Sequence, residues 1–287
     1  MGWIKHLKGA IANLNPDEVR EQAERPIRIG IHAATELSFF HMESYFAPAS
    51  LSGGRRSEAK RMLARVEPAT PNNLFDIEIH SEGAGEPPGS FLFSFDEPER
   101  TVRRILAKHP GLALPLARNL APFRQPVVDR IVHSVARENA VFSLATALPD
   151  IIPLISLPWA AGEFASDTAV LTANQVRMTF LLGAASDRAV GYREQKTEIA
   201  SIVGGAFGWR SLARELVGKI PLGGGLIPKA AIAYAGTWVV GRSIERLYRF
   251  GYRLTRQERH DAYEQALERG KAIAGSLLRT RGKKSLA

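Results

Sequence analysis

The sequence predicts an α+β protein, in which a small N-terminal α/β unit of about three strands precedes a mainly α-helical C-terminal domain with helical hairpins. Isoleucines alternate at positions 27, 29 and 31, and two more alternating segments follow before Glu97. Beyond Glu97, apolar residues recur at helical spacing and no further strand pattern is convincing. The 287 residues, 45% hydrophobic and 23% charged, have a globular composition and are enough for two ordinary domains.

Residues 1–25 predict N-terminal amphipathic helices. Apolar residues between Trp3 and Leu14 fall on one helical face, which suits either a membrane interface or docking onto the protein's own body. A second helix is expected to begin near Asn15, which can cap it, with Pro16 in the first helical position.

Residues 26–96 predict the small α/β unit. A strand over Ile27–Ile31 is followed by helical patterns in "TELSFFHMESYF" and over Arg55–Val66. Two more strands are expected in "NLFDIEIH" and "SFLFSF", joined by the turn-rich "SEGAGEPPG". No phosphate loop follows the first strand, because "GIHAATELSF" lacks both a second glycine and a lysine.

Residues 97–257 predict the helical domain, and residues 258–287 a basic C-terminal helix and tail. "EPERTVRRILAKH" and "PVVDRIVHSVARENAVFSLATA" are helical patterns, the second opened by Pro126. Val141–Gly162 and Ile220–Gly241 are apolar runs interrupted by prolines or charges. They are compatible with buried helices of a soluble bundle, with membrane spans, or with re-entrant hairpins broken by proline.

The segment "GKIPLGGGLIPKAAIAYAGTWVVG" raises the question of a nucleotide site. Gly223 and Lys229 have the separation of a phosphate-binding loop, but Pro228 has no N–H to donate and Ala230 replaces the hydroxyl that would hold magnesium. We therefore expect a bend between two apolar helices. The predicted hinge comprises Pro221, Gly223, Gly224 and Gly225.

No catalytic, cofactor-binding or metal-ligating residue is predicted. The chain has no cysteine, which excludes disulfides, thiolate zinc sites and cysteine nucleophiles. Its seven histidines form no pair at helical spacing, so the sequence offers no metal site. These absences favour a non-enzymatic protein without a cofactor.

A set of polar residues is expected to meet inside the helical domain. Glu163, Asp167 and Asn174 fall on one face of an otherwise apolar helix, and buried carboxylates need partners. The predicted cluster comprises Asp150, Glu163, Asp167, Asn174, Arg210 and Arg214. It can be an interhelical salt-bridge network, or it can line a polar pocket or ion path.

Positive charge is concentrated at the C-terminal end. The net charge is +9, and the residues from Arg242 onward contain twelve Lys or Arg against five acids. Arginines recur there at helical spacing, interleaved with aromatic residues, which favours an anionic surface such as lipid headgroups or nucleic acid. A solvated tail is the alternative. The predicted stripe comprises Arg242, Arg246, Arg249, Arg253 and Arg256.

The segment "GAFGWRSLARELVGKIPLGGGLIPKAAIAYAGTWVVGRS" resembles the bacterial family known as domain of unknown function 697. The resemblance implies a helical, membrane-associated domain of a kind often fused behind small GTPase domains, here with an α/β unit that cannot hold GTP through a phosphate loop. It implies location at the cytoplasmic face of the inner membrane, or in the cytoplasm.

The function expected from all of these features is that of a non-enzymatic helical module that binds a membrane surface, anionic lipid and a protein partner, for example a GTPase in trans. Two alternatives remain open at this stage. One is a nucleotide-binding protein or hydrolase that uses the α/β unit, and the other is a soluble scaffold that binds nucleic acid through its basic tail.

Overall fold

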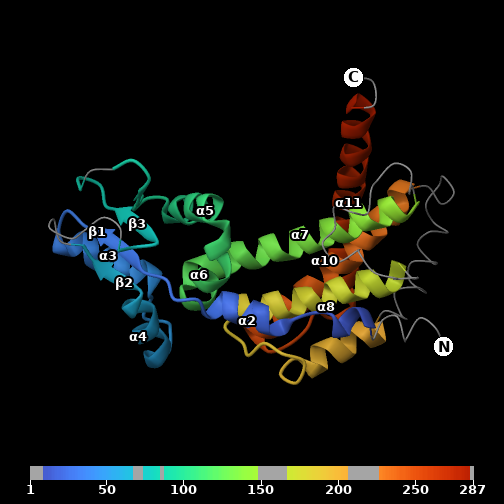
Figure 1. Ribbon diagram of the computed structural model, residues 1–287, viewed down its shortest axis with the longest axis horizontal. Helices are drawn as coiled ribbons and strands as arrows, with labels where there is room; N and C mark the ends of the chain where they lie inside the picture. Colours follow the sequence, from blue (N-terminus) through green and yellow to red (C-terminus); the bar gives the residue numbers. More distant parts are fainter. Residues whose placement is uncertain (1–8, 67–73, 85–86, 148–166, 206–225, 285–287) are drawn as a thin grey trace. The chain divides into compact units, whose positions relative to one another are not determined.

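The protein is described by a computed structural model, which covers residues 9–66, 74–84, 87–147, 167–205 and 226–284. The chain divides into two compact units (Figure 1). The sheet unit consists of Glu18–Asp129 with Ala184–Arg188, and the helical unit consists of Met1–Asp17, Arg130–Gly183 and Ala189–Ala287. The predicted α+β class is confirmed. The sheet unit extends to Asp129, past the boundary expected at residue 96, and so includes helices that follow the sheet in the chain.

Four parallel strands form the sheet: β1 (Ile29–His32), β2 (Leu63–Arg65), β3 (Ile77–His80) and β4 (Phe91–Leu92), in the order β2-β1-β3-β4. The helix expected over Arg55–Val66 was predicted with the wrong end, because α4 (Gly53–Arg61) ends at Arg61 and the strand β2 begins at Leu63. A strand of three residues is too short for alternation to reveal. Pairing with β1, which is a tertiary contact, fixes it as a strand.

Short helices accompany the sheet: α2 (Pro16–Glu24), α3 (Glu36–Phe46), α5 (Pro98–Lys108), a 3₁₀ turn at Pro110–Leu112 and α6 (Ala113–Asn119). The predicted start of α2 is confirmed, since Asn15 Oδ1 accepts a hydrogen bond of 3.1 Å from the amide of Asp17. Of the preceding predicted helix, residues 9–12 are helical, and residues 1–8 lie outside the described part of the chain.

Large apolar side chains make the core of the sheet unit. Ile29, Ile31, Ile77 and Ile79 point to one face of β1 and β3, and all four are buried. Phe46 of α3 stacks on Phe123, with ring centroids 5.9 Å apart and both rings fully buried. The alternating isoleucines that predicted the strands therefore face the core.

Long helices make up the helical unit: α8 (Asp167–Ala185), α10 (Leu226–Phe250), α11 (Arg256–Lys284) and most of α7 (Ala121–Ala147). The start of α7 at Pro126 was predicted wrongly, because the helix begins five residues earlier at Ala121. Arg124 holds this first turn by donating hydrogen bonds to the carbonyls of Ala117 and Arg118, and these side-chain bonds follow no helical periodicity in the sequence.

The helices α10 and α11 form an antiparallel hairpin, as the predicted class required. Arg246 pairs with Glu258 near the turn, and Trp238 lies against Arg269 further along. Gly270 allows the closest approach, since a Cβ there would lie 2.9 Å from Ala231 Cα. Small buried residues dominate the shared core, namely Ala136 and Ala140 of α7, Ala230 and Ala235 of α10, and Ala266 and Ala274 of α11.

Candidate functional site

The turn between α10 and α11, residues 251–255, has a helix-capping motif at each end. Gly251 ends α10 with φ +82, and its amide donates to the Leu247 carbonyl, as in a left-handed helix cap. Thr255 and Glu258 start α11 with a capping box: Glu258 Oε2 accepts from the Thr255 amide at 2.8 Å, and Thr255 Oγ1 accepts from the Glu258 amide at 3.3 Å. The bonds that the Thr255 amide, and after it the Thr255 hydroxyl, donate to the Glu258 carboxylate lower the pKa of Glu258 below its ordinary value.

Two large aromatic side chains, from the last residue of α10 and from the turn itself, project into solvent here. Phe250 is 55% exposed and Tyr252 is 54% exposed, with ring centroids 6.0 Å apart. Single exposed apolar side chains are ordinary on a folded surface, whereas large apolar side chains that lie together there mark candidate contact sites.

Arginine side chains surround this aromatic pair. The guanidinium of Arg249 lies 5.0 Å from the centroid of the Phe250 ring, and that of Arg246 lies 5.0 Å from the centroid of the Tyr252 ring. The hydrogen bond to Tyr252 contributes most to raising the pKa of Arg246. From Arg246 to Arg259 the sequence carries five arginines and one acid, Glu258. We call residues 246–259 the basic turn.

The predicted arginine stripe is thus not one helical face, which corrects the sequence analysis. Because α10 ends at Phe250, Arg253 lies in the connection and Arg256 is the first residue of α11. Arg242 lies further back on α10, where it pairs with Glu245 at 2.6 Å and covers the Trp238 ring. The structure replaces a stripe by a cluster around the turn.

Of the predicted polar cluster, only Asp167 and Asn174 lie in the described part of the chain. Asp150, Glu163, Arg210 and Arg214 lie outside the described residues, as does the hinge Pro221, Gly223, Gly224 and Gly225. Asp167 begins α8, and nothing of its side chain is described.

Asn174 is buried and belongs to a neutral network. Its amide donates to Asn139 Oδ1 at 2.7 Å, and Asn139 donates in turn to Thr237 Oγ1 at 2.7 Å. The network joins α8, α7 and α10 and satisfies polar groups inside the core of the helical unit, which is a structural role. Lys229, which has the sequence separation of a phosphate-loop lysine from Gly223, lies in the first turn of α10 and donates to Thr146 Oγ1 at 3.3 Å.

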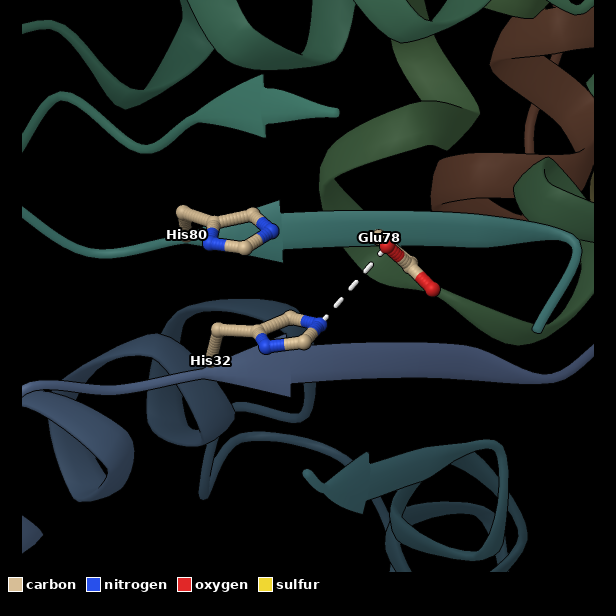
Figure 2. Close-up of side chains that lie close together, drawn as sticks. All are labelled: His32, Glu78 and His80. Atoms are coloured by element: carbon tan, nitrogen blue, oxygen red, sulfur yellow. Dashed lines mark ion pairs between the residues drawn. The ribbon is translucent and has the colours of Figure 1, made fainter. Parts of the chain in front are cut away.

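The sheet unit brings together three side chains that sequence reasoning did not group: His32, Glu78 and His80 (Figure 2). His32 and His80 are register partners at the carboxyl ends of β1 and β3, and their rings stack with centroids 3.9 Å apart and planes 7° apart. Glu78 precedes His80 by two residues, so its side chain leaves the same face of the strand. His32 Nε2 lies 3.8 Å from Glu78 Oε2.

A sequence signal for this cluster existed. The segments "IGIH" and "IEIH" each end an isoleucine alternation with a histidine, and in a parallel sheet the carboxyl ends of neighbouring strands meet at one edge. Histidine pairs at helical spacing do not reveal this cluster, because His32 and His80 pair across strands and not along a helix.

Comparisons with protein-family models, with curated proteins and with solved structures find no match for this chain. The resemblance stated from the sequence therefore stays a prediction. Within the described ranges, none of the helices has the length and apolar content needed to cross a membrane.

Proposed function

We propose that the helical unit binds anionic membrane surfaces peripherally through the basic turn. The observation that carries this proposal is the exposed pair Phe250 and Tyr252, each with an arginine guanidinium over its ring. Aromatic rings favour the headgroup level of a bilayer, and an arginine near an anionic surface contributes about 1 kcal/mol. A rigid helical hairpin would present both kinds of side chain at one point.

The mode of binding follows from these residues. The rings of Phe250 and Tyr252 enter the interface while the arginines stay at the level of the lipid phosphates, as amphipathic side chains do. Arg253 and Arg256 are exposed, and their charges are available to phosphate. A protein partner, including a GTPase supplied in trans, is part of the proposed function only through the family resemblance.

Vesicle flotation of the full chain tests the proposal. Binding is expected to vesicles of phosphatidylcholine with phosphatidylglycerol, to be weak with phosphatidylcholine alone, and to fall at high salt. Replacing both rings (Phe250→Ala with Tyr252→Ala) is expected to abolish flotation. Arg253→Ala with Arg256→Ala is expected to weaken binding about 30-fold, because two arginines contribute about 2 kcal/mol.

The matched control removes two exposed apolar side chains from the sheet unit, Leu37→Ala with Phe40→Ala, which are as exposed as the rings of the turn. This variant is expected to float like the unmodified chain. If it loses flotation equally, or if the Phe250 and Tyr252 variant still floats, the proposal is wrong. Binding of duplex DNA or RNA in the same salt series, without vesicle binding, would favour the alternative of a nucleic-acid scaffold.

A further inference from the structure

The second site of interest lies at the point of the sheet where the strand order changes direction. From β1 the chain proceeds to β2 on one side, and β3 then lies on the other side of β1. In open parallel sheets, ligands bind beyond the carboxyl ends of the strands at such a switch point. His32 and His80 are the last residues of β1 and β3, so they lie at this point.

The three side chains share one face of the sheet for a reason that the sequence fixes. Isoleucines at the odd positions of β1 and β3 turn to the core, and the even positions therefore carry Gly30, His32, Glu78 and His80 on the opposite face. Gly30 lies beneath Phe75 and Val66, because a Cβ there would come within 2.8 Å of both side chains. Phe75 and Val66 therefore cover this face at Gly30, and His32, Glu78 and His80 lie on the same face toward the carboxyl ends of the strands.

The group is partly buried, and some of its polar atoms lack hydrogen bonds. The side chains of His32 and Glu78 are 21% and 19% exposed, and His80 is 2% exposed. Among the described residues, His32 Nε2 and Glu78 Oε1 are buried atoms that make no hydrogen bond. Leaving such groups unsatisfied is costly, so a bound ion or water is the ordinary explanation for them.

The geometry points to a binding site for a divalent transition-metal ion, with His32, Glu78 and His80 as its three protein ligands. One donor atom from each residue lies within 4.8 Å of the other two. Two imidazoles and one carboxylate are the ligand set of zinc sites that keep a fourth position open for water or another oxygen ligand. Nitrogen ligands disfavour Mg²⁺ and Ca²⁺, which prefer oxygen.

Ion binding requires a small adjustment of the side chains. Zinc holds its nitrogen and oxygen ligands at about 2.0–2.2 Å, so neighbouring ligand atoms of a tetrahedral site lie roughly 3.4 Å apart. The imidazole lone pair lies in the plane of its ring, so the two stacked rings must turn toward a common point. Hydrogen bonds fix the backbone beyond both strands while the side chains turn. The Ser81 amide donates to the His32 carbonyl, and Ser81 Oγ accepts from the Ala34 amide, both at 2.9 Å.

Zinc titration of the full chain after chelator treatment tests the site, by calorimetry and by the visible absorption of Co²⁺ as a substitute. We expect one ion per chain. Replacing residues that only support a metal ligand weakens affinity by about 10–100-fold, so His32→Ala or Glu78→Gln is expected to weaken it at least about 100-fold. The control is His41→Ala, an exposed histidine of α3 in the same unit, which is expected to leave affinity unchanged.

Two results of the titrations overturn the inference. One is a chain that binds no zinc, and the other is zinc affinity that persists in both His32→Ala and Glu78→Gln. X-ray absorption of the zinc complex provides a readout that needs no variant. Two imidazole nitrogens with oxygen ligands support the site, whereas a different number of imidazoles contradicts it. Glu78→Gln keeps the shape of the side chain, so its result does not depend on whether His32→Ala folds.

Discussion

The two units of this protein are stabilised by different kinds of core. The sheet unit buries isoleucines and phenylalanines, among them Phe46 stacked on Phe123. In the helical unit, six alanines line the core shared by α7, α10 and α11, Gly270 lets α10 and α11 approach closely, and the network of Asn139, Asn174 and Thr237 is enclosed. The first core depends on the amount of apolar surface removed from water, and the second depends on close approach and on satisfied polar groups.

The architecture of each unit also determines which residues meet at its candidate binding site. In the sheet unit, strand register puts residues that are distant in sequence at one edge, which is how His32 meets His80. In the helical unit, a hairpin brings together residues that are close in sequence, and the basic turn is therefore built from residues 246–259 alone. The substitutions below are ordered from the largest expected effect on the free energy of unfolding to the smallest.

Phe46→Ala is expected to have the largest effect. Removing a fully buried phenylalanine from a well-packed core lowers the free energy of unfolding by about 3–5 kcal/mol. Denaturant unfolding measures it, with Phe40→Ala on the exposed face of the same helix as the control, expected to stay within about 0.5 kcal/mol. Equal effects of the two substitutions would show that the sheet unit does not depend on this core.

Asn139→Ala tests the polar core of the helical unit. The substitution leaves the buried Asn174 amide without this partner, at about 1–3 kcal/mol, and Thr237 Oγ1 keeps only its bond from Gln175 Nε2 at 3.4 Å and so costs less, for an expected total loss of about 2–4 kcal/mol. Ser134→Ala, at an exposed position on the same helix, is the control. A neutral Asn139→Ala would mean that the network contributes nothing to stability.

A pair of glycines in α11 tests the close approach. Gly270→Ala is expected to lower the free energy of unfolding by about 1–3 kcal/mol, because its Cβ would press on the backbone of Ala231. Gly275→Ala has room, its nearest atom being an Arg279 guanidinium nitrogen 4.0 Å away, and should raise it by about 0.5–1 kcal/mol through helix propensity. The account of the hairpin fails if thermal unfolding finds the same sign for both.

Thr255→Ala is expected to have the smallest destabilising effect, about 1 kcal/mol, because it removes the cap of α11. Thr255→Ser keeps the hydroxyl and serves as its control.

The pH dependence has a defined sign. Folding lowers the pKa of Glu258 from its ordinary 4.5, so its contribution to stability is present above pH 4.5 and is lost as the pH falls through the folded value. Thr255→Ala removes the hydroxyl bond to the Glu258 carboxylate, so part of its difference from the unmodified chain should disappear as the pH falls below 4.5, while the part due to the bond from the Glu258 amide to Thr255 Oγ1 should remain. A difference that stays constant to lower pH would contradict the role given to the capping box.

Local patterns were sufficient for much of the fold. Ile29 and Ile31 alternate because one face of β1 is buried, and Asn15 with Pro16 marks the start of α2 by capping chemistry. Both signals lie within a few residues of the feature that they predict. The strand β2 was missed because pairing with β1, more than 30 residues away, creates it. The true start of α7 was missed because the bonds from Arg124 to the carbonyls of Ala117 and Arg118 follow no helical periodicity.

The same distinction applies to the sites. The basic turn was visible as an arginine periodicity, although Gly251 breaks the helix that the periodicity implied. The metal-ligand group was not predicted, because the segments that end in His32 and His80 show it only once β1 and β3 are known to pair in parallel.

The central claim is that the two units carry two separable binding functions, and one flotation experiment tests it directly. Chains supplied with one equivalent of Zn²⁺ are floated with vesicles containing phosphatidylglycerol, and both protein and zinc are measured in each fraction. The unmodified chain should float with one zinc, Glu78→Gln should float without zinc, and the Phe250→Ala, Tyr252→Ala variant should stay in the dense fraction with its zinc. Loss of flotation in Glu78→Gln, or loss of zinc from the variant of the turn, would contradict the claim.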